Sequence, residues 1–157
     1  MMEVTARAAT SEDLETLDKL YRALEEEMVA IHPMWPLADG LPEPVEEALA
    51  KAIADPDAVV TMGVIDDVPL GFLLARVEEL LPQAKDRQIG AIRLVFVERE
   101  AREVGVGEEM LALTLKELRG RGLDRFDAHV LPGHRLVKNF FEAGGFAARS
   151  IVMHHAD

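Results

Sequence analysis

The clearest chemical pattern in the sequence lies between Ile92 and Leu111. An apolar run ends at Val97, a short charged loop follows, and Gly105 and Gly107 then open a predicted helix. The first turn of a helix leaves N–H groups unpaired at the positive end of its dipole, and glycine lets an anion come close to them. The segment therefore predicts a phosphate-binding loop, to which Arg102 would add positive charge. A pair of glycines alone would suit an ordinary tight turn equally well.

The residues around this loop resemble the GNAT superfamily of acyl-CoA-dependent N-acyltransferases. The signature of that family is [RQ]-x-x-G-x-[GA] behind a strand that ends in valine. Arg102, Gly105 and Gly107 match it, five residues after Val97. The spacing and the preceding strand make this match far more specific than the two glycines alone.

Two further blocks are similar to the same family and occur in the family's order. They are an early hairpin at 65–72 and a late strand, helix and Gly-Phe ending at 130–146. The resemblance covers essentially the whole chain and implies a single GNAT-like domain, 1–157. The fold that it implies is α/β, with mixed α+β character: a central mixed, mostly antiparallel sheet with a splayed parallel strand pair, flanked by about four helices.

Hydrophobic periodicity also predicts a mixed α/β domain, in the order strand, two helices, three strands, helix, strand, helix, strand. The strand ending at Val97 is apolar on both faces except for Arg93, which favours a central place in the sheet. The expected strands are 3–9, 58–65, 70–77, 90–97, 125–131 and 146–154, and the expected helices carry the apolar stripes of 14–31, 45–53, 106–118 and 136–141.

The resemblance implies that acyl-CoA, most simply acetyl-CoA, is the co-substrate. Its pantetheine arm would enter between the strands ending at Val97 and Val130 and pair with backbone groups near Phe96 and Val97. Its pyrophosphate would rest on the N–H groups from Arg102 to Gly107. The cofactor-binding residues so implied are Phe96, Val97, Arg102, Glu103, Val104, Gly105, Val106, Gly107, His134 and Phe141.

Three of these positions depart from the family pattern. Glu103 replaces a frequent glycine and brings a carboxylate near the phosphates, and His134 replaces the usual asparagine. Phe141 replaces a tyrosine whose hydroxyl is commonly assigned to protonating the departing CoA thiolate. Because a thiol has a pKa of about 8.5, its thiolate leaves tolerably well without an acid, so the loss should slow the reaction rather than abolish it. Phe141 is expected to pack on the pantetheine arm or in the core.

An acceptor amine must lose a proton before it attacks a thioester, so a base or a water relay is needed. The strand ending at Val97 carries Arg93 and has no carboxylate that could serve as this base. The remaining candidates are His129, His134, Glu98, and an acid or His32 from the first helix and its following loop. His129 is the first choice, and its alternative role is that of a buried histidine bonded to backbone. A backbone N–H near Val97 would hold the oxyanion.

The acceptor side of the cleft is expected between the first two helices. His32 and Trp35 lie there as candidate substrate-binding residues, although Trp35 could equally seal the core. The net charge is −12, and residues 1–60 hold 14 acids against 4 bases. An aromatic wall beside carboxylates favours a cationic amine, on a small molecule or a protein. Solubility alone would also explain the acidity.

Composition excludes several other classes. The chain has no cysteine, which excludes a thiol enzyme and a disulfide scaffold, and its acidity argues against nucleic-acid binding. The five histidines show no metal-ligand spacing, and neither a signal sequence nor a membrane span is evident, so a cytoplasmic protein is expected. The resemblance adds a homodimer as one candidate assembly, because relatives often dimerise through their terminal strands.

The sequence thus predicts an acyl-CoA-dependent N-acetyltransferase that works by direct attack in a ternary complex. The alternative is a catalytically weak acyl-CoA-binding sensor, which the missing tyrosine and the missing strand carboxylate favour. A Rossmann-type nucleotide site is disfavoured, because the glycines do not follow G-x-G-x-x-G.

Overall fold

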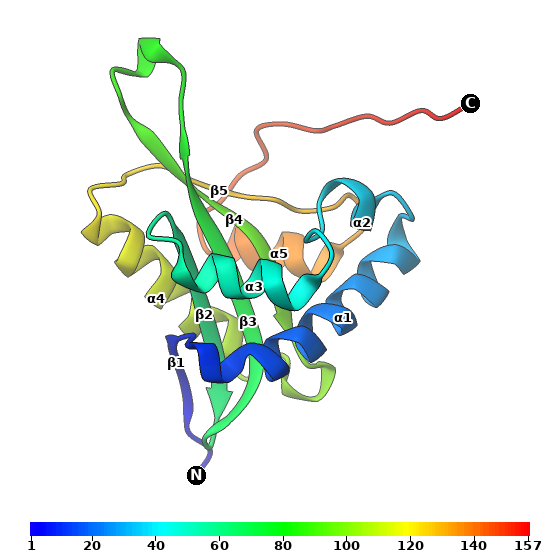
Figure 1. Cartoon of the computed structure of the whole chain (residues 1–157), viewed down its shortest axis with the longest axis vertical. Helices are drawn as coiled ribbons and strands as arrows, with labels where there is room; N and C mark the ends of the chain where they lie inside the picture. The colour runs from blue at the N-terminus through cyan, green and yellow to red at the C-terminus, as the bar shows by residue number, and fades with distance from the viewer.

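In the computed structural model, which describes all 157 residues, one five-stranded sheet is combined with five helices (Figure 1). The strands are β1 (Val4–Ala8), β2 (Ala58–Ile65), β3 (Val68–Glu79), β4 (Gln88–Val97) and β5 (Phe126–Ala128). The helices are α1 (Leu14–Ile31), α2 (Trp35–Ala38), α3 (Val45–Ala54), α4 (Val106–Gly120) and α5 (Arg135–Ala143). The strand order is β1-β2-β3-β4-β5, antiparallel except for the parallel pair β4–β5. This confirms the predicted mixed fold. Strand β4 has a neighbour on each side, but β3 is the middle strand and β5 pairs with β4 only from Gly90 to Ile92.

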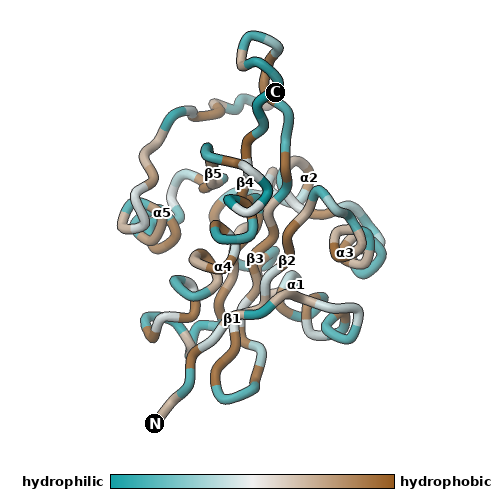
Figure 2. The backbone as a smooth tube through the Cα atoms, turned by 90° about the vertical axis from the view of Figure 1, so that its left-hand side faces the viewer, coloured by the Kyte–Doolittle hydropathy of each residue, from teal (hydrophilic) through white to brown (hydrophobic).

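The sheet separates two hydrophobic cores because successive strand residues face opposite sides. Leu74 of β3 packs in the core under α1 and α3, whereas its neighbour Leu73 packs in the core under α4 and α5. Figure 2 shows the sheet close to edge-on, with α1 and α3 on one side and α4 and α5 on the other. The helices therefore form two outer layers around the sheet.

The first helix follows its predicted apolar stripe. Its buried side chains are Leu17, Leu20, Tyr21, Leu24 and Met28, at most 6% exposed. Before the helix, the carboxylate of Asp13 accepts a hydrogen bond from the Thr10 N–H (2.8 Å) and pairs with Arg7. The bond from Arg7 is the main cause that lowers the pKa of Asp13.

The predicted strand at 146–154 is wrong. Residues 146–157 form neither helix nor strand, and Figure 1 shows them leading away from the body of the molecule. No strand lies on the outer edge of β5 for this segment to pair with, and Ile151, Val152 and Met153 are 69–89% exposed. An ion pair of Arg149 with Asp127 connects the segment to β5. Because this segment is where the resemblance put dimer contacts, the homodimer stays a prediction.

Three other elements differ from the predicted ones. Strand β5 ends at Ala128 rather than at residue 131, and Trp35–Ala38 forms a short helix between the first two predicted helices, where no helix or strand was expected. The connection 78–88, expected to be polar loop, continues the β3–β4 hairpin, which projects beyond the sheet (Figure 1). None of the helices combines the length and apolar composition that crossing a bilayer requires.

Candidate active site

The parallel strands β4 and β5 separate after a short paired stretch. Their last paired residues are Ile92 and Ala128, and the His129 N–H donates one more bond to the Ile92 carbonyl (2.9 Å). Beyond this point β4 continues to Val97 without a β5 partner. The structure therefore has the splayed parallel pair that the resemblance implied.

A β-bulge lies where the splay begins. Opposite β3, Leu94 pairs with Leu74 and Ile92 with Ala75, which leaves Arg93 without a partner. Such a bulge bends its strand and increases the local twist, and bulges are frequent beside active sites. Arg93 is the one charged residue of this strand, and its place in the sequence does not reveal that it lies at a bulge.

The open edge of β4 presents main-chain groups to the gap. The Glu98 N–H donates to the Leu70 carbonyl of the hairpin (2.8 Å), so this position faces β3. Because backbone groups alternate between the two edges of a strand, those of Val95 and Val97 face the side from which β5 has departed. An extended amide-bearing molecule can pair there as a strand would.

A small cavity of about 20 Å³, room for about one water molecule, lies beside this edge. It is lined by residues from α1, α2, β4, the end of β5 and α5: Leu24, Met28, Trp35, Arg93, Leu94, Val95, His129, His134 and Val137. Trp35 is 5% exposed and packs against Tyr21 with ring centroids 6.2 Å apart. It therefore seals the core, as one of its two expected roles required, and also lines the cavity, while its role in substrate binding stays a prediction.

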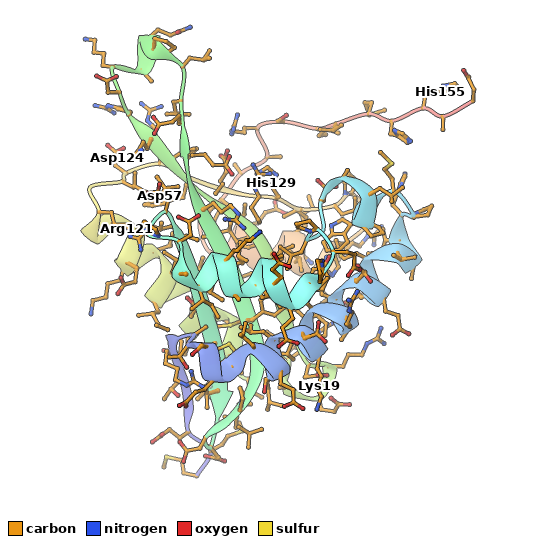
Figure 3. The ribbon with its side chains drawn as sticks, in the orientation of Figure 1. Lys19, Asp57, Arg121, Asp124, His129 and His155 are labelled. Atoms are coloured by element: carbon orange, nitrogen blue, oxygen red, sulfur yellow. The ribbon has the colours of Figure 1, made fainter.

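His129 lies at the rim of this cavity. Its Nδ1 is 3.4 Å from Arg93 Nη1, and Arg93 is held by two 2.8 Å bonds to the carboxylate of Glu78 on β3. Shielding from water and the positive charge of Arg93 lower the pKa of His129 below its ordinary value. The imidazole is therefore neutral at pH 7 and able to accept a proton. In Figure 3 His129 lies beside the sheet, whereas His155 lies far out on the C-terminal segment.

His134 is the second histidine of the cavity, at the start of α5. Its side chain is 10% exposed, and Nε2 lies 3.8 Å from the Glu27 carboxylate. Burial lowers the pKa of His134, Glu27 opposes that shift and Arg102 reinforces it. The structure thus brings His134 to the cavity together with His129, as two candidate proton acceptors.

His32, by contrast, does not line the cavity. Its Nδ1 accepts a hydrogen bond from the Met34 N–H (3.1 Å), which fixes the turn between α1 and α2. Its ring lies 5.8 Å from that of His154 in the C-terminal segment. Glu98, another candidate base, follows β4 and also falls outside the lining residues.

The predicted phosphate loop ends at the N-terminus of α4. Gly105 caps the helix with φ +101°, a conformation that favours glycine, and its carbonyl accepts the Glu109 N–H (3.0 Å). Glu103 also has positive φ, +67°. Val104 is 40% exposed, whereas Val106 is 1% exposed in the core. The free N–H groups of the first helical turn can receive an anion here.

Gly107 has a packing role in addition to the phosphate-binding role expected of it. A Cβ at this position would lie 2.9 Å from the ring of Phe140 on α5. The glycine therefore allows α4 and α5 to pack closely. Of the two signature glycines, only Gly105 shapes the backbone at the helix start.

Arg102 does not carry a free positive charge to this loop. Its Nη atoms bond to the carboxylate of Glu27 on α1 (3.1 and 3.0 Å), and its Nε donates to the Val97 carbonyl (2.8 Å). Its guanidinium also lies over the ring of Phe96, 5.4 Å from the centroid. The expected extra charge is thus neutralised by an acid 75 residues away in the sequence, which sequence reasoning did not find.

Phe141 lies in the core rather than at the cavity. It is 2% exposed, and its ring contacts those of Phe140 and Phe146 at centroid distances of 5.1 and 5.2 Å. Of its two expected places, core packing is the one that the structure has. No three His, Asp or Glu side chains are grouped so that they could hold a metal ion.

A splayed parallel strand pair, an open strand edge and a glycine-capped helix start together are typical of an α/β acyltransferase fold. The model of the acetyltransferase (GNAT) family matches residues 17–146, and the chain belongs to that family. No curated protein matches the chain by sequence.

Solved structures with the same fold share little sequence with this chain. A tetramutant of the BH1408 protein from Bacillus halodurans has 17% identity and a TM-score of 0.81, covering 96% of this chain and 98% of its own. The aminoglycoside N-acetyltransferase AAC(6')-Iy in complex with CoA has 17% identity and a TM-score of 0.73, covering 100% and 95%. An aminoglycoside acetyltransferase from an uncultured soil metagenomic sample has 17% identity and a TM-score of 0.69, covering 99% and 95%. At such identities the likeness establishes the fold.

Proposed function

We propose that this protein transfers an acetyl group from acetyl-CoA to a primary amine by direct attack in a ternary complex. The observation that carries the proposal is the free edge of β4 at Val95 and Val97, next to the glycine-capped start of α4. One site could then bind an amide-bearing arm by strand pairing and a pyrophosphate by helix N–H groups. The solved AAC(6')-Iy complex with CoA, which has the same fold, supports this choice of co-substrate.

The residues of the site fit acyl-CoA mainly through main-chain groups. The main-chain groups of Val95 and the N–H of Val97 would pair with the arm, because the Val97 carbonyl already accepts the bond from Arg102 Nε. The N–H groups from Glu103 to Gly107 would hold the phosphates. When bound, acyl-CoA supplies the activated thioester. His129 is the proposed base: it is neutral at pH 7, stands at the cavity rim, and would take the proton that the amine loses.

Addition of CoA tests this proposal most cheaply. Ligand at 100 times its Kd adds about 2.7 kcal/mol to the free energy of unfolding, which for a chain of this size raises Tm by roughly 5–10 °C. Thermal denaturation with CoA, acetyl-CoA and NAD would measure it. We expect a shift with both CoA species and none with NAD; no shift with either CoA species would refute the proposed co-substrate.

A cationic acceptor is the second part of the proposal. Negative charges of Glu78, Asp127 and Asp39 act on His129, and the first two are paired with arginines, which leaves Asp39 to attract a ligand. Two of the structurally similar proteins are, by name, aminoglycoside acetyltransferases. We expect kcat/KM for a diamine to exceed that for its neutral-tailed isostere by about tenfold. Thiol release with matched amine pairs measures this ratio of kcat/KM values. Equal values would mean that the acidity of the chain serves solubility alone.

An acyl-CoA sensor is the second candidate function. The absence of a hydroxyl at Phe141 and of a carboxylate on β4 favours it. The two functions separate once CoA binding is established. Turnover of any amine at about 1 per second or faster, a typical enzyme rate, would exclude the sensor.

A further inference from the structure

Glu27 is a nearly buried carboxylate to which the proposed reaction gives no role. It projects from α1, whose Leu24 and Met28 line the cavity, and its side chain is 15% exposed. It pairs through both oxygens with Arg102 and lies 3.8 Å from His134. One acid thus touches the cofactor loop and faces a cavity histidine.

The pair fixes Arg102 in a particular orientation. A guanidinium carries five N–H donors in a rigid plane, and a bidentate carboxylate determines the direction of that plane. With two nitrogens on Glu27, the third, Nε, points at the Val97 carbonyl. The loop from Glu98 to Gly105 is thereby connected at Arg102 to both α1 and the end of β4.

The conformation of this loop needs such support. Glu103 has a positive φ that side chains other than glycine rarely adopt, and Gly105 follows with another. Glu103 and Val104 are exposed, so little packing holds them. Arg102, at 22% side-chain exposure, is the loop's main polar connection to the rest of the fold.

We propose that Glu27 is a positioning residue for cofactor binding: by holding Arg102 on the Val97 carbonyl, it keeps the loop and the free edge of β4 in the arrangement that receives CoA. This inference rests on the proposed function in that CoA is the ligand. Glu27 touches no cofactor atom in this scheme and acts through Arg102. Because it lies on the helix that lines the cavity, it also links the acceptor side of the site to the cofactor side.

The test is Glu27→Gln, which keeps the shape of the side chain and removes its charge. We expect the Kd for CoA, measured by calorimetry, and the KM for acetyl-CoA to rise on the order of tenfold, within the usual range of coupling between sites. The kcat at saturating acetyl-CoA should change by less than about threefold, because Glu27 touches no reacting group. In the free protein, the loop amides that are hydrogen-bonded, Ala101 to the Glu98 carbonyl and Arg102 to the Arg99 carbonyl, should exchange faster than in the wild type.

Glu26→Gln is the matched control, because Glu26 is the exposed neighbour on the same helix and forms no ion pair. It should leave Kd and exchange unchanged. Should Glu27→Gln not fold, Arg102→Lys keeps the charge but loses the planar fork, and the same rise in Kd is expected from it. In the double variant the two effects should not add, since they break one contact.

Unchanged CoA affinity in Glu27→Gln would overturn the proposal, and tighter binding would too, because it would mean that the carboxylate merely repels phosphate. The exchange measurement needs no CoA, so it distinguishes a failure of the positioning role from a failure of the proposed function. If the wild type bound no CoA, the proposed function would fail. Wild-type exchange in the loop of Glu27→Gln would refute the positioning role itself.

Discussion

Replacement of His129 by glutamine should lower kcat by about 100-fold or more, the usual contribution of a positioned general base. The amine is protonated at neutral pH, and in the proposed reaction His129 removes that proton. Glutamine keeps the size and polarity of the side chain but cannot accept a proton. Thiol release at saturating substrates would measure the loss.

The assignment of His129 as the base also predicts how activity depends on pH. A base works in its neutral form, so activity is lost as the pH falls through its pKa. Shielding and Arg93 lower the pKa of His129 below 6.5, so the acid limb of kcat/KM in the wild type should lie below that pH. In His129→Gln this limb should disappear. A limb that persists would assign it to another group.

His134→Gln and His32→Gln are the matched controls. His32 is occupied by the Met34 N–H and lies outside the cavity lining, so its variant should keep wild-type kcat and the acid limb. His134 lines the cavity and is the competing base. If His134→Gln loses kcat and the limb while His129→Gln retains both, the base is His134 and our assignment is wrong.

The fold was predictable where the signal is local. The apolar stripe of α1 follows the helical period, and β2 and β3 are short, mainly apolar runs. All three elements formed, although β3 extends from Val68 to Glu79 rather than over 70–77. The segment 146–154 has the composition of a strand but no neighbour to pair with. Strand formation requires a partner edge, and hydrophobic composition does not reveal whether one is available.

The site, like the fold, was predictable where its residues are close together in the sequence. The start of α4 was predictable because its residues, Arg102 and Gly105, are neighbours in the sequence. The pairs Glu27–Arg102 and Glu78–Arg93 were not, because they join distant segments. Which side chains meet depends on strand register and helix placement, and the bulge at Arg93 changes the register by one residue. The sequence alone therefore does not show that these acids on α1 and β3 have arginine partners.

The second large effect is expected from Gly105→Val. At φ +101° a β-branched side chain is strained, since even ordinary L-residues lose about 1–2 kcal/mol in left-handed geometry. The strain should displace the free N–H groups at the start of α4. Loss of two hydrogen bonds to phosphate, about 1.5–3 kcal/mol each, weakens CoA binding about 100-fold or more. Calorimetric titration with CoA would measure the loss.

Gly120→Val is the control at the other end of α4, where nothing lies within 4 Å of an added Cβ and φ is not positive. It should retain CoA affinity. Wild-type CoA affinity in a folded Gly105→Val would mean that the phosphates bind elsewhere than at the start of α4.

Glu103→Gly should act in the opposite direction from Gly105→Val. Glycine accepts the φ of +67° at this position, and the substitution removes a carboxylate beside the phosphates, so CoA should bind about threefold more tightly. The stability of this variant should change little, since relief of strain offsets the conformational entropy of glycine.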